Sequence, residues 1–296
     1  MKNKNHILLI VNPISGNMDK DDLIETVRKE TDRRNLSMAI YKTTGSNDDD
    51  GIEKLIDTFD PDRILVAGGD GTIRQVADIL KGHNIPLGII PAGSANGLAV
   101  NLEIPKTLPE QLEVALGQSL ITIDLLSVND HTTLHIADMG INAELIKNYE
   151  NSNMHGKLGY LLQCIPTLVD CDYPFDFEVT ANGETFCQEG VLLAIANANK
   201  FGTGANINPT GKMNDGKFEV LIFKNLDLIQ IFKTLYGEVD MNSDFVRMTC
   251  TDHAKISCKK KTGLQIDGEY LGEVDSIEAF VSSQNLEIAV PATFEH

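Results

Sequence analysis

The residues best placed for chemistry form one unbroken run, Gly68-Gly69-Asp70-Gly71-Thr72. An apolar stretch, 63–67, leads into this run and a helical pattern, 73–80, follows it. A glycine turn between a strand and a helix directs backbone N–H groups toward an anion, and it lets a phosphate approach closely. Asp70 could hold Mg²⁺ directly or through water, and Thr72 suits a helix N-cap. The run therefore predicts an anion site, with an ordinary capped turn as the alternative.

Other turns in the same half of the chain also follow predicted strands. The strands are predicted at 7–11, 37–41, 63–67 and 86–90, and the helices at 21–34, 48–56, 73–80 and 109–116. This alternation predicts a parallel, doubly wound α/β sheet, in which ligands bind beyond the carboxyl ends of the strands. The turns at Asn12, Thr43 and Pro91 fall at those ends beside the glycine run, so the four turns predict one ligand site. Asp48 is expected to be a solvated helix start.

The second half of the chain has a different pattern of apolar residues. Short alternating segments predict strands at 132–137, 175–180, 191–196, 218–223, 254–257, 263–266 and 276–281, with helices near 157–169 and 226–236. This pattern favours an antiparallel β domain. We therefore predict an α/β domain at 1–125, a β-rich domain at 126–285, and a segment at 286–296 whose strand returns to the first domain.

Composition limits the classes of partner. The 296 residues are 42% hydrophobic, as in a globular protein, and carry a net charge of −18, which repels nucleic acid and, on average, anionic membranes. No apolar run reaches the roughly 18 residues that a membrane span needs. The five cysteines form no C-x-x-C pair, which favours reduced thiols in a cytoplasm over zinc or disulfides.

Several motifs occur in order along the chain. They are Asn12-Pro13-x-Ser15-Gly16, the run 68–72, Pro91-x-Gly93-Ser94-x-Asn96, Asn197-x-x-x-Phe201-Gly202, Asp215-Gly216 and Asp267-Gly268-Glu269. The combination resembles the diacylglycerol kinase catalytic-domain family, which includes bacterial soluble lipid kinases, sphingosine kinases and ceramide kinases. The glycine run alone is shared with NAD kinases and 6-phosphofructokinases, but the resemblance extends over nearly the whole chain.

The resemblance implies ATP-dependent phosphorylation of a hydroxyl of diacylglycerol, sphingosine or a related lipid. It implies an N-terminal domain like that of NAD kinase and 6-phosphofructokinase, which binds ATP, and a sandwich-like antiparallel domain for the lipid. The family's nucleotide-binding positions match Asn12, Pro13, Ser15, Gly16, Thr43, Gly68, Gly69, Asp70, Gly71, Thr72, Ser94 and Asn96. Phosphoryl transfer depends on positioning and charge neutralisation, which N–H groups, hydroxyls and Mg²⁺ supply.

The family also implies two catalytic residues. Glu269 is the expected general base on the lipid hydroxyl, because an alcohol becomes a good nucleophile as its proton is accepted. Asp70 is the second, through its Mg²⁺. The alternative for 267–269 is an ordinary hairpin turn, since Asp-Gly is a favoured hairpin pair.

The loop 211–218 matches a segment that holds a structural Mg²⁺ in bacterial members of the family. Asp215 would be its charged ligand, with the carbonyls of Lys212 and Lys217 beside it, and hard cations accept such a mixture of oxygens. Asp124 is assigned to a Mg²⁺–water network with Asp70. A solvated turn at Asp215 and a hinge carboxylate at Asp124 stay open as alternatives.

The chain departs from the family pattern at Gly97, where many bacterial diacylglycerol kinases carry an aspartate after the asparagine. This departure is closer to the sphingosine-kinase branch and leaves the lipid open. Asp138 matches part of the family's lipid cleft and could bind a head group, or could be a strand-end carboxylate. The expected partner is a lipid reached by transient, peripheral contact with a membrane; a homodimer, a kinase for a soluble alcohol such as NAD, and a non-catalytic nucleotide-binding regulator stay open.

Overall fold

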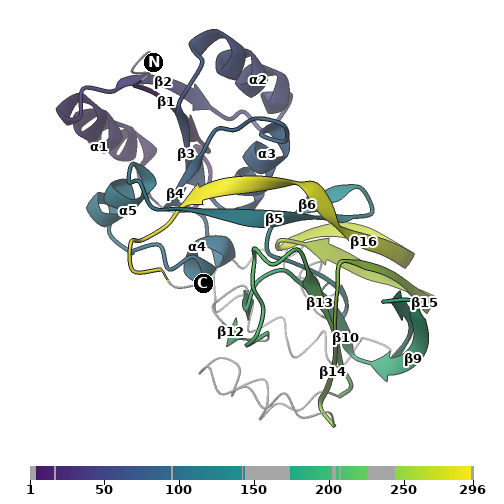
Figure 1. Ribbon diagram of the computed structural model, residues 1–296. Coiled ribbons are helices and arrows are strands. Elements are labelled where there is room, and N and C mark those ends of the chain that lie inside the picture. The colour runs from purple at the N-terminus through teal and green to yellow at the C-terminus, as the bar shows by residue number, and fades with distance from the viewer. Residues whose placement is uncertain are drawn as a thin grey trace. The chain divides into compact units, whose positions relative to one another are not determined.

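The chain folds into two compact units in a computed structural model, which describes residues 5–294 except 17, 95, 142, 144–173, 202–204, 207 and 226–243 (Figure 1). The first unit comprises residues 1–123 and 284–296, and the second comprises residues 124–283. Within the described ranges, no helix is long and apolar enough to cross a lipid bilayer.

Four parallel strands form the main sheet of the first unit. Their order is β2 (Ser37–Lys42), β1 (His6–Val11), β3 (Arg63–Gly68) and β4 (Leu87–Pro91). Val11 is paired with Lys42 on one side and with Ala67 on the other, and Ala67 is paired with Ile90. Because these four residues lie in one row across parallel strands, the turns that follow them all begin at the same edge of the sheet.

Helices cover both faces of this sheet. They are α1 (Lys20–Arg33), α2 (Asp48–Phe59), α3 (Asp70–Ile79), α4 (Gly97–Asn101) and α5 (Leu108–Ala115). Figure 1 shows α1 and α5 on one face and α2 and α3 on the other. Leu9 of β1 packs in one cluster with Leu23 and Val27 of α1, while Leu8 and Ile10, which alternate to the opposite face, are also fully buried. The predicted doubly wound α/β fold is confirmed.

Two long strands run through the boundary between the units. β5 (Leu120–Val128) begins in the first unit, and β16 (Glu269–Ala289) begins in the second and ends in the first. There Ile288 pairs in parallel with Leu87 of β4, and the Val290 N–H donates to the Ser119 carbonyl at 3.0 Å. The two segments predicted as separate strands, 276–281 and 286–290, are therefore parts of β16.

Antiparallel strands build the second unit. They are β6 (His131–Thr133), β7 (Ile136–Gly140), β8 (Phe175–Ala181), β9 (Glu184–Gly190), β10 (Leu192–Ala196), β13 (Phe218–Phe223), β14 (Val246–Thr251) and β15 (His253–Ile266), with the short pair β11 (Lys200–Phe201) and β12 (Ala205–Asn206). The central strands pair in the order β13, β10, β7 and β15, and Phe177 and Phe218 are among the largest side chains of their shared core. The predicted β-rich, antiparallel class of this half is confirmed.

The strands of the second unit differ from the prediction in further places. The predicted strand 132–137 is interrupted at 134–135 between β6 and β7, while the predicted strands 254–257 and 263–266 form the single strand β15, whose pairing shifts between Ser257 and Thr262. Neither β9 nor β14 was predicted. The helices predicted near 157–169 and 226–236 lie outside the described residues.

Candidate active site

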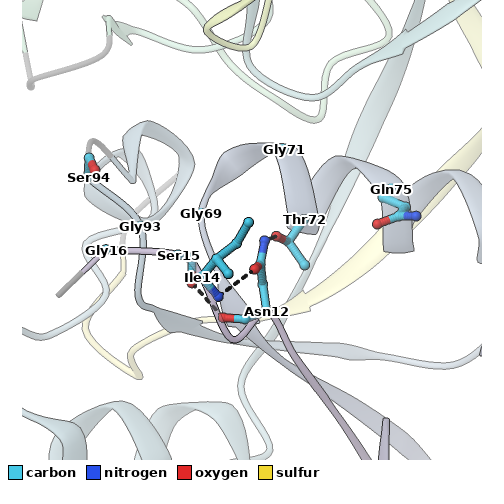
Figure 2. A pocket seen from close by; sticks show the side chains of 10 residues that line it. All are labelled: Asn12, Ile14, Ser15, Gly16, Gly69, Gly71, Thr72, Gln75, Gly93 and Ser94. Carbon is cyan, nitrogen blue, oxygen red and sulfur yellow. Dashed lines mark hydrogen bonds between the residues drawn. The ribbon is translucent and has the colours of Figure 1, made fainter. Parts of the chain in front are cut away.

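A pocket of about 420 Å³ lies at the carboxyl edge of the parallel sheet in the first unit. Figure 2 shows its lining, which comes from the turn after β1, the start of α3 and the turn after β4: Asn12, Ile14, Ser15, Gly16, Gly69, Gly71, Thr72, Gln75, Gly93 and Ser94. Its volume is in the range of small-molecule sites. None of the ten lining side chains carries a formal charge, so hydroxyls, amides and main chain provide its polar groups.

The main chains of the three turns, after β1, before α3 and after β4, lie in direct contact. A Cβ on Gly16, whose φ is +55°, would lie 2.3 Å from the Ala92 carbonyl oxygen. A Cβ on Gly93 would lie 2.5 Å from the Cα of Gly69. No side chain fits at these two positions, and this is the physical reason for glycine at Gly16 and Gly93.

Asn12 connects the turn after β1 to the start of α3 through a hydrogen bond. Its Nδ2 donates to the Thr72 hydroxyl at 3.0 Å, and its Oδ1 accepts the Ile14 N–H at 3.1 Å (Figure 2). The Ser15 hydroxyl donates to the Asn12 carbonyl at 3.0 Å.

The prediction that Thr72 is a helix N-cap is wrong: α3 begins at Asp70, so the N-cap is Gly69 and Thr72 is the third helical residue. Because Gly69 offers no side-chain cap, the first N–H groups of α3 lack the acceptor that a serine or aspartate would supply.

Asp70 joins the glycine run to the turn after β4. Its Oδ2 accepts the Gly97 N–H at 2.8 Å and its Oδ1 accepts the Leu98 N–H at 3.1 Å, so its carboxylate caps α4. Gly97, the residue that departs from the family pattern, thus supplies one of the donors. Asn96, at φ +56°, closes the same turn, because its Oδ1 accepts the Gly93 N–H at 2.8 Å and its Nδ2 donates to the Gly93 carbonyl at 2.9 Å. Both residues hold the turn after β4, and neither is among the residues that line the pocket.

Seven predicted nucleotide-binding residues line this pocket. They are Asn12, Ser15, Gly16, Gly69, Gly71, Thr72 and Ser94. The other five, Pro13, Thr43, Gly68, Asp70 and Asn96, are not among the lining residues. Ile14 and Gly93 lie inside the predicted motifs and also line it. Gln75 lies outside the motifs and could have been suspected because it lies one helical turn beyond Gly71 and Thr72.

Two buried charged residues support the turns at this edge. Lys20, 8% exposed, donates from Nζ to the carbonyls of Ser15 at 2.6 Å and Met18 at 2.9 Å. Burial lowers the pKa of Lys20, against the raising effect of Asp19. The sequence offered no signal for this role, because a lysine in the first helical turn is normally solvated.

Asp48 is buried, at 3% exposure, so its expected role as a solvated helix start is wrong. Its carboxylate accepts the N–H groups of Thr44 and Gly45, both at 2.8 Å, and hydroxyl hydrogens from Thr44 and Tyr41, both at 3.0 Å. Burial alone raises the pKa of Asp48, but these hydrogen bonds outweigh it and hold the pKa below its usual value. Asp48 therefore fixes the turn that follows Thr43.

In the second unit, Asp267 and Gly268 form a two-residue hairpin turn between β15 and β16. Their φ angles are +49° and +88°, as a type I′ turn requires, and Ile266 is paired with Glu269 across it. The Asp267 carboxylate is turned inward and accepts the N–H groups of Leu134, His135 and Ile136 at 2.9–3.0 Å. Glu269 is exposed at the start of β16. The two acids of this motif thus have different surroundings.

Asp124 lies against the loop that was predicted to hold Mg²⁺. Its Oδ2 accepts the Gly216 N–H at 2.7 Å, and its own N–H donates to the Met213 carbonyl at 2.6 Å. Asp215 accepts the Lys217 N–H at 3.0 Å and, like Lys212, is exposed. Among the described residues no three His, Cys, Asp or Glu side chains are grouped as a metal site. A cation here would therefore need the mixed carboxylate and carbonyl donors that Mg²⁺ and Ca²⁺ accept.

Family models match both halves of the chain. Residues 6–128 match the diacylglycerol kinase catalytic domain, and residues 136–290 match the YegS C-terminal NAD kinase beta sandwich-like domain. A protein of Bacillus subtilis named diacylglycerol kinase is 28% identical over 273 residues, which are 89% of each chain. A protein of Citrobacter koseri named "Probable lipid kinase YegS-like" is 31% identical over 58% of this chain and 60% of its own.

Solved structures show the same fold. The crystal structure of a diacylglycerol kinase from Bacillus anthracis has a TM-score of 0.77 at 17% identity, with all of both chains covered. An NAD kinase from Archaeoglobus fulgidus, solved in complex with ATP, has a TM-score of 0.54 at 14% identity and covers 96% of this chain and 93% of its own. The two matched domains and the named relatives show that the chain belongs to the diacylglycerol kinase catalytic-domain family of lipid kinases, with the YegS-type C-terminal domain.

Proposed function

We propose that this protein transfers the γ-phosphoryl group of ATP to a hydroxyl of a lipid such as diacylglycerol or sphingosine. The observation that carries the proposal is the uncharged pocket at the carboxyl edge, whose walls are glycine main chain and hydroxyl groups. Phosphoryl transfer needs positioned donors around the phosphates more than it needs covalent chemistry from the protein.

The donor set of the pocket fits a polyphosphate. Gly16, Gly69 and Gly93 let the three turns pack closely, and at Gly71 the space that a Cβ would occupy is open, so a phosphate oxygen can approach the start of α3. Thr72 receives the hydrogen bond of the Asn12 Nδ2, so its own hydroxyl hydrogen is left for another acceptor, and a phosphate oxygen would provide one. Because the lining holds no lysine or arginine, neutralisation of the phosphates would fall to Mg²⁺, for which Asp70 retains unused lone pairs, and to the N-terminus of α3.

Glu269 is our candidate for the general base on the acceptor. It is exposed, and a carboxylate at neutral pH can accept the proton of a lipid hydroxyl as that oxygen attacks phosphorus. The loop at 212–217, with Asp215 and Asp124, has the oxygen chemistry to hold a structural Mg²⁺, which would rigidify this part of the second unit when bound.

The test is transfer of labelled phosphate from ATP to vesicles that contain diacylglycerol, sphingosine, ceramide or monoacylglycerol, with NAD as a water-soluble acceptor. We expect label in at least one lipid and none in NAD. Glu269→Gln should lower turnover by about 10²–10⁴-fold. Glu273→Gln, a change at another exposed glutamate of β16, should leave turnover unchanged.

Each contrary result would support a different function or a different role for Glu269. Label in NAD alone would replace the lipid with a soluble alcohol. ATP binding with no transfer to any acceptor would indicate a regulator without catalysis. Full turnover in Glu269→Gln, with an unchanged melting temperature, would remove Glu269 from the mechanism.

A further inference from the structure

A buried polar chain lies directly behind the hairpin turn that carries Glu269. Gln265 of β15 is fully buried and pairs with Asp138 of β7 in the sheet register. Its Nε2 donates to the Asp138 Oδ2, and its Oε1 accepts the Gly268 N–H at 2.8 Å. Both ends of one carboxamide are therefore engaged, one with a carboxylate and one with the residue before Glu269.

The partners permit only one orientation of this carboxamide. The Gly268 N–H can only donate, so it requires the oxygen of Gln265, and the nitrogen is then left to donate to the Asp138 carboxyl group. Rotation of the amide by 180° would break both bonds at once. Asp138 is 0% exposed, in a strand that pairs with β10 and β15, so its side chain is not on the surface where a head group could bind. Its role is therefore internal.

A second set of bonds holds the other residue of the turn. Besides the three N–H groups that its carboxylate accepts, Asp267 donates its own N–H to the Ile136 carbonyl at 2.8 Å. Both residues before Glu269 are thus tied to 134–138, Asp267 directly and Gly268 through Gln265. A two-residue hairpin turn at a surface would otherwise be free to flex, and its exposed glutamate with it.

We propose that Gln265 and Asp138 are positioning residues that hold the main chain at Gly268, and through it the carboxylate of Glu269, in the place that proton transfer requires. This inference rests on the proposed role of Glu269. Catalytic groups tolerate little displacement, since a shift of about 1 Å can cost about 100-fold in rate. Neither Gln265 nor Asp138 needs to touch the lipid or ATP.

The test is a double-mutant cycle in the full-length protein. Gln265→Met keeps the length of the side chain and removes both hydrogen bonds; we expect kcat to fall by about 10–100-fold while KM for ATP stays unchanged. In a Glu269→Gln background the same change should lower kcat no further, because the group that it positions is already absent. Single-turnover assays at high enzyme concentration measure these low rates.

A matched control separates positioning from loss of stability. Gln111, 3% exposed in α5, also donates from Nε2, to the carbonyls of Pro105 and Lys106. Gln111→Met should lower the melting temperature while leaving kcat unchanged in the native sequence and in Glu269→Gln. Asp138→Asn retains an acceptor for the Gln265 Nε2 and should keep kcat within about threefold, whereas Asp138→Leu removes the acceptor and should match Gln265→Met.

The outcomes are distinct. If Glu269→Gln lowers kcat, and Gln265→Met or Asp138→Leu lowers kcat by its full factor in the Glu269→Gln background as well, the positioning role is overturned and the proposed function stands. If Glu269→Gln turns over at the native rate, the proposed base is wrong and the positioning role is overturned with it. If Gln265→Met does not fold, Asp138→Asn and Asp138→Leu are compared in the same way, with and without Glu269→Gln. Equal losses of kcat in Asp138→Asn and Asp138→Leu overturn the inference.

Discussion

Replacement of Asp70 by alanine tests whether this carboxylate has the structural role of capping α4. The change removes the acceptor of the Gly97 and Leu98 N–H groups and leaves the start of α4 without its cap. A hydrogen bond to a charged group contributes about 1.5–3 kcal/mol, and removal of an N-cap costs about 1 kcal/mol. Asp70 is half-buried, so water can replace part of the loss. We therefore expect the free energy of unfolding to fall by about 2–3 kcal/mol.

Urea unfolding followed by circular dichroism measures this loss, and calorimetry measures ATP binding on the same samples. We expect ATP affinity to fall as well, because the turn that carries Gly93 and Ser94 loses its connection to α3. The matched control is Asp78→Ala on the exposed face of α3, which removes an ion pair with Lys81 and should cost less than about 1 kcal/mol. Unchanged unfolding of Asp70→Ala, within about 0.5 kcal/mol of the native protein, would refute the capping role.

Three further predictions concern single side chains. Gly16→Ala should weaken ATP binding at least about tenfold, measured by calorimetry, because its Cβ would meet main chain and its φ is +55°; native affinity would contradict the tight turn. Lys20→Met should lower kcat/KM for ATP by about tenfold, with partial rescue in Lys20→Arg, because the Ser15 carbonyl loses its donor; an unchanged kcat/KM would exclude a supporting role. Hydrogen bonding to Arg33, opposed by burial, lowers the pKa of Glu30 from 4.5 to about 2. This depressed pKa contributes stability above pH 4.5 that is lost as the pH falls toward 2, so Glu30→Gln should flatten the urea midpoint across that range, and parallel profiles would argue against it.

Local patterns were sufficient to predict the first unit. β1 and β3 are nearly continuous apolar runs, as strands covered on both faces must be, and the motif spacing placed the turns at one edge. The second unit was harder to predict. The polar stretch Lys259-Lys260-Lys261 interrupts the alternation expected of a strand, yet β15 continues through it, because a shift in pairing accommodates the extra residues. β9 was missed because its mostly exposed, polar residues lack an apolar alternation.

At the candidate site, the sequence predicted seven of the ten residues that line the pocket, but not the hydrogen bonds that each residue makes. Asp48 and Lys20 carry no motif, and their roles depend on partners that tertiary folding brings to them. Thr72 was assigned a cap because its residue type suits one, although the helix starts two residues earlier. Asp70 was expected to bind metal, and only the structure shows its bonds to α4. Residue type and order therefore predict location, whereas hydrogen-bond roles require coordinates.

The contact of glycine main chain at Gly16, Gly69 and Gly93 has a consequence for engineering. This backbone part of the pocket keeps its shape when side chains elsewhere are exchanged, because no rotamer contributes to it. The pocket can be altered at two of its side chains, since Ile14 is 87% exposed and Gln75 donates to Asp49 at 2.6 Å. A redesign of the proposed nucleotide preference should therefore vary Ile14 and Gln75 and keep the three glycines.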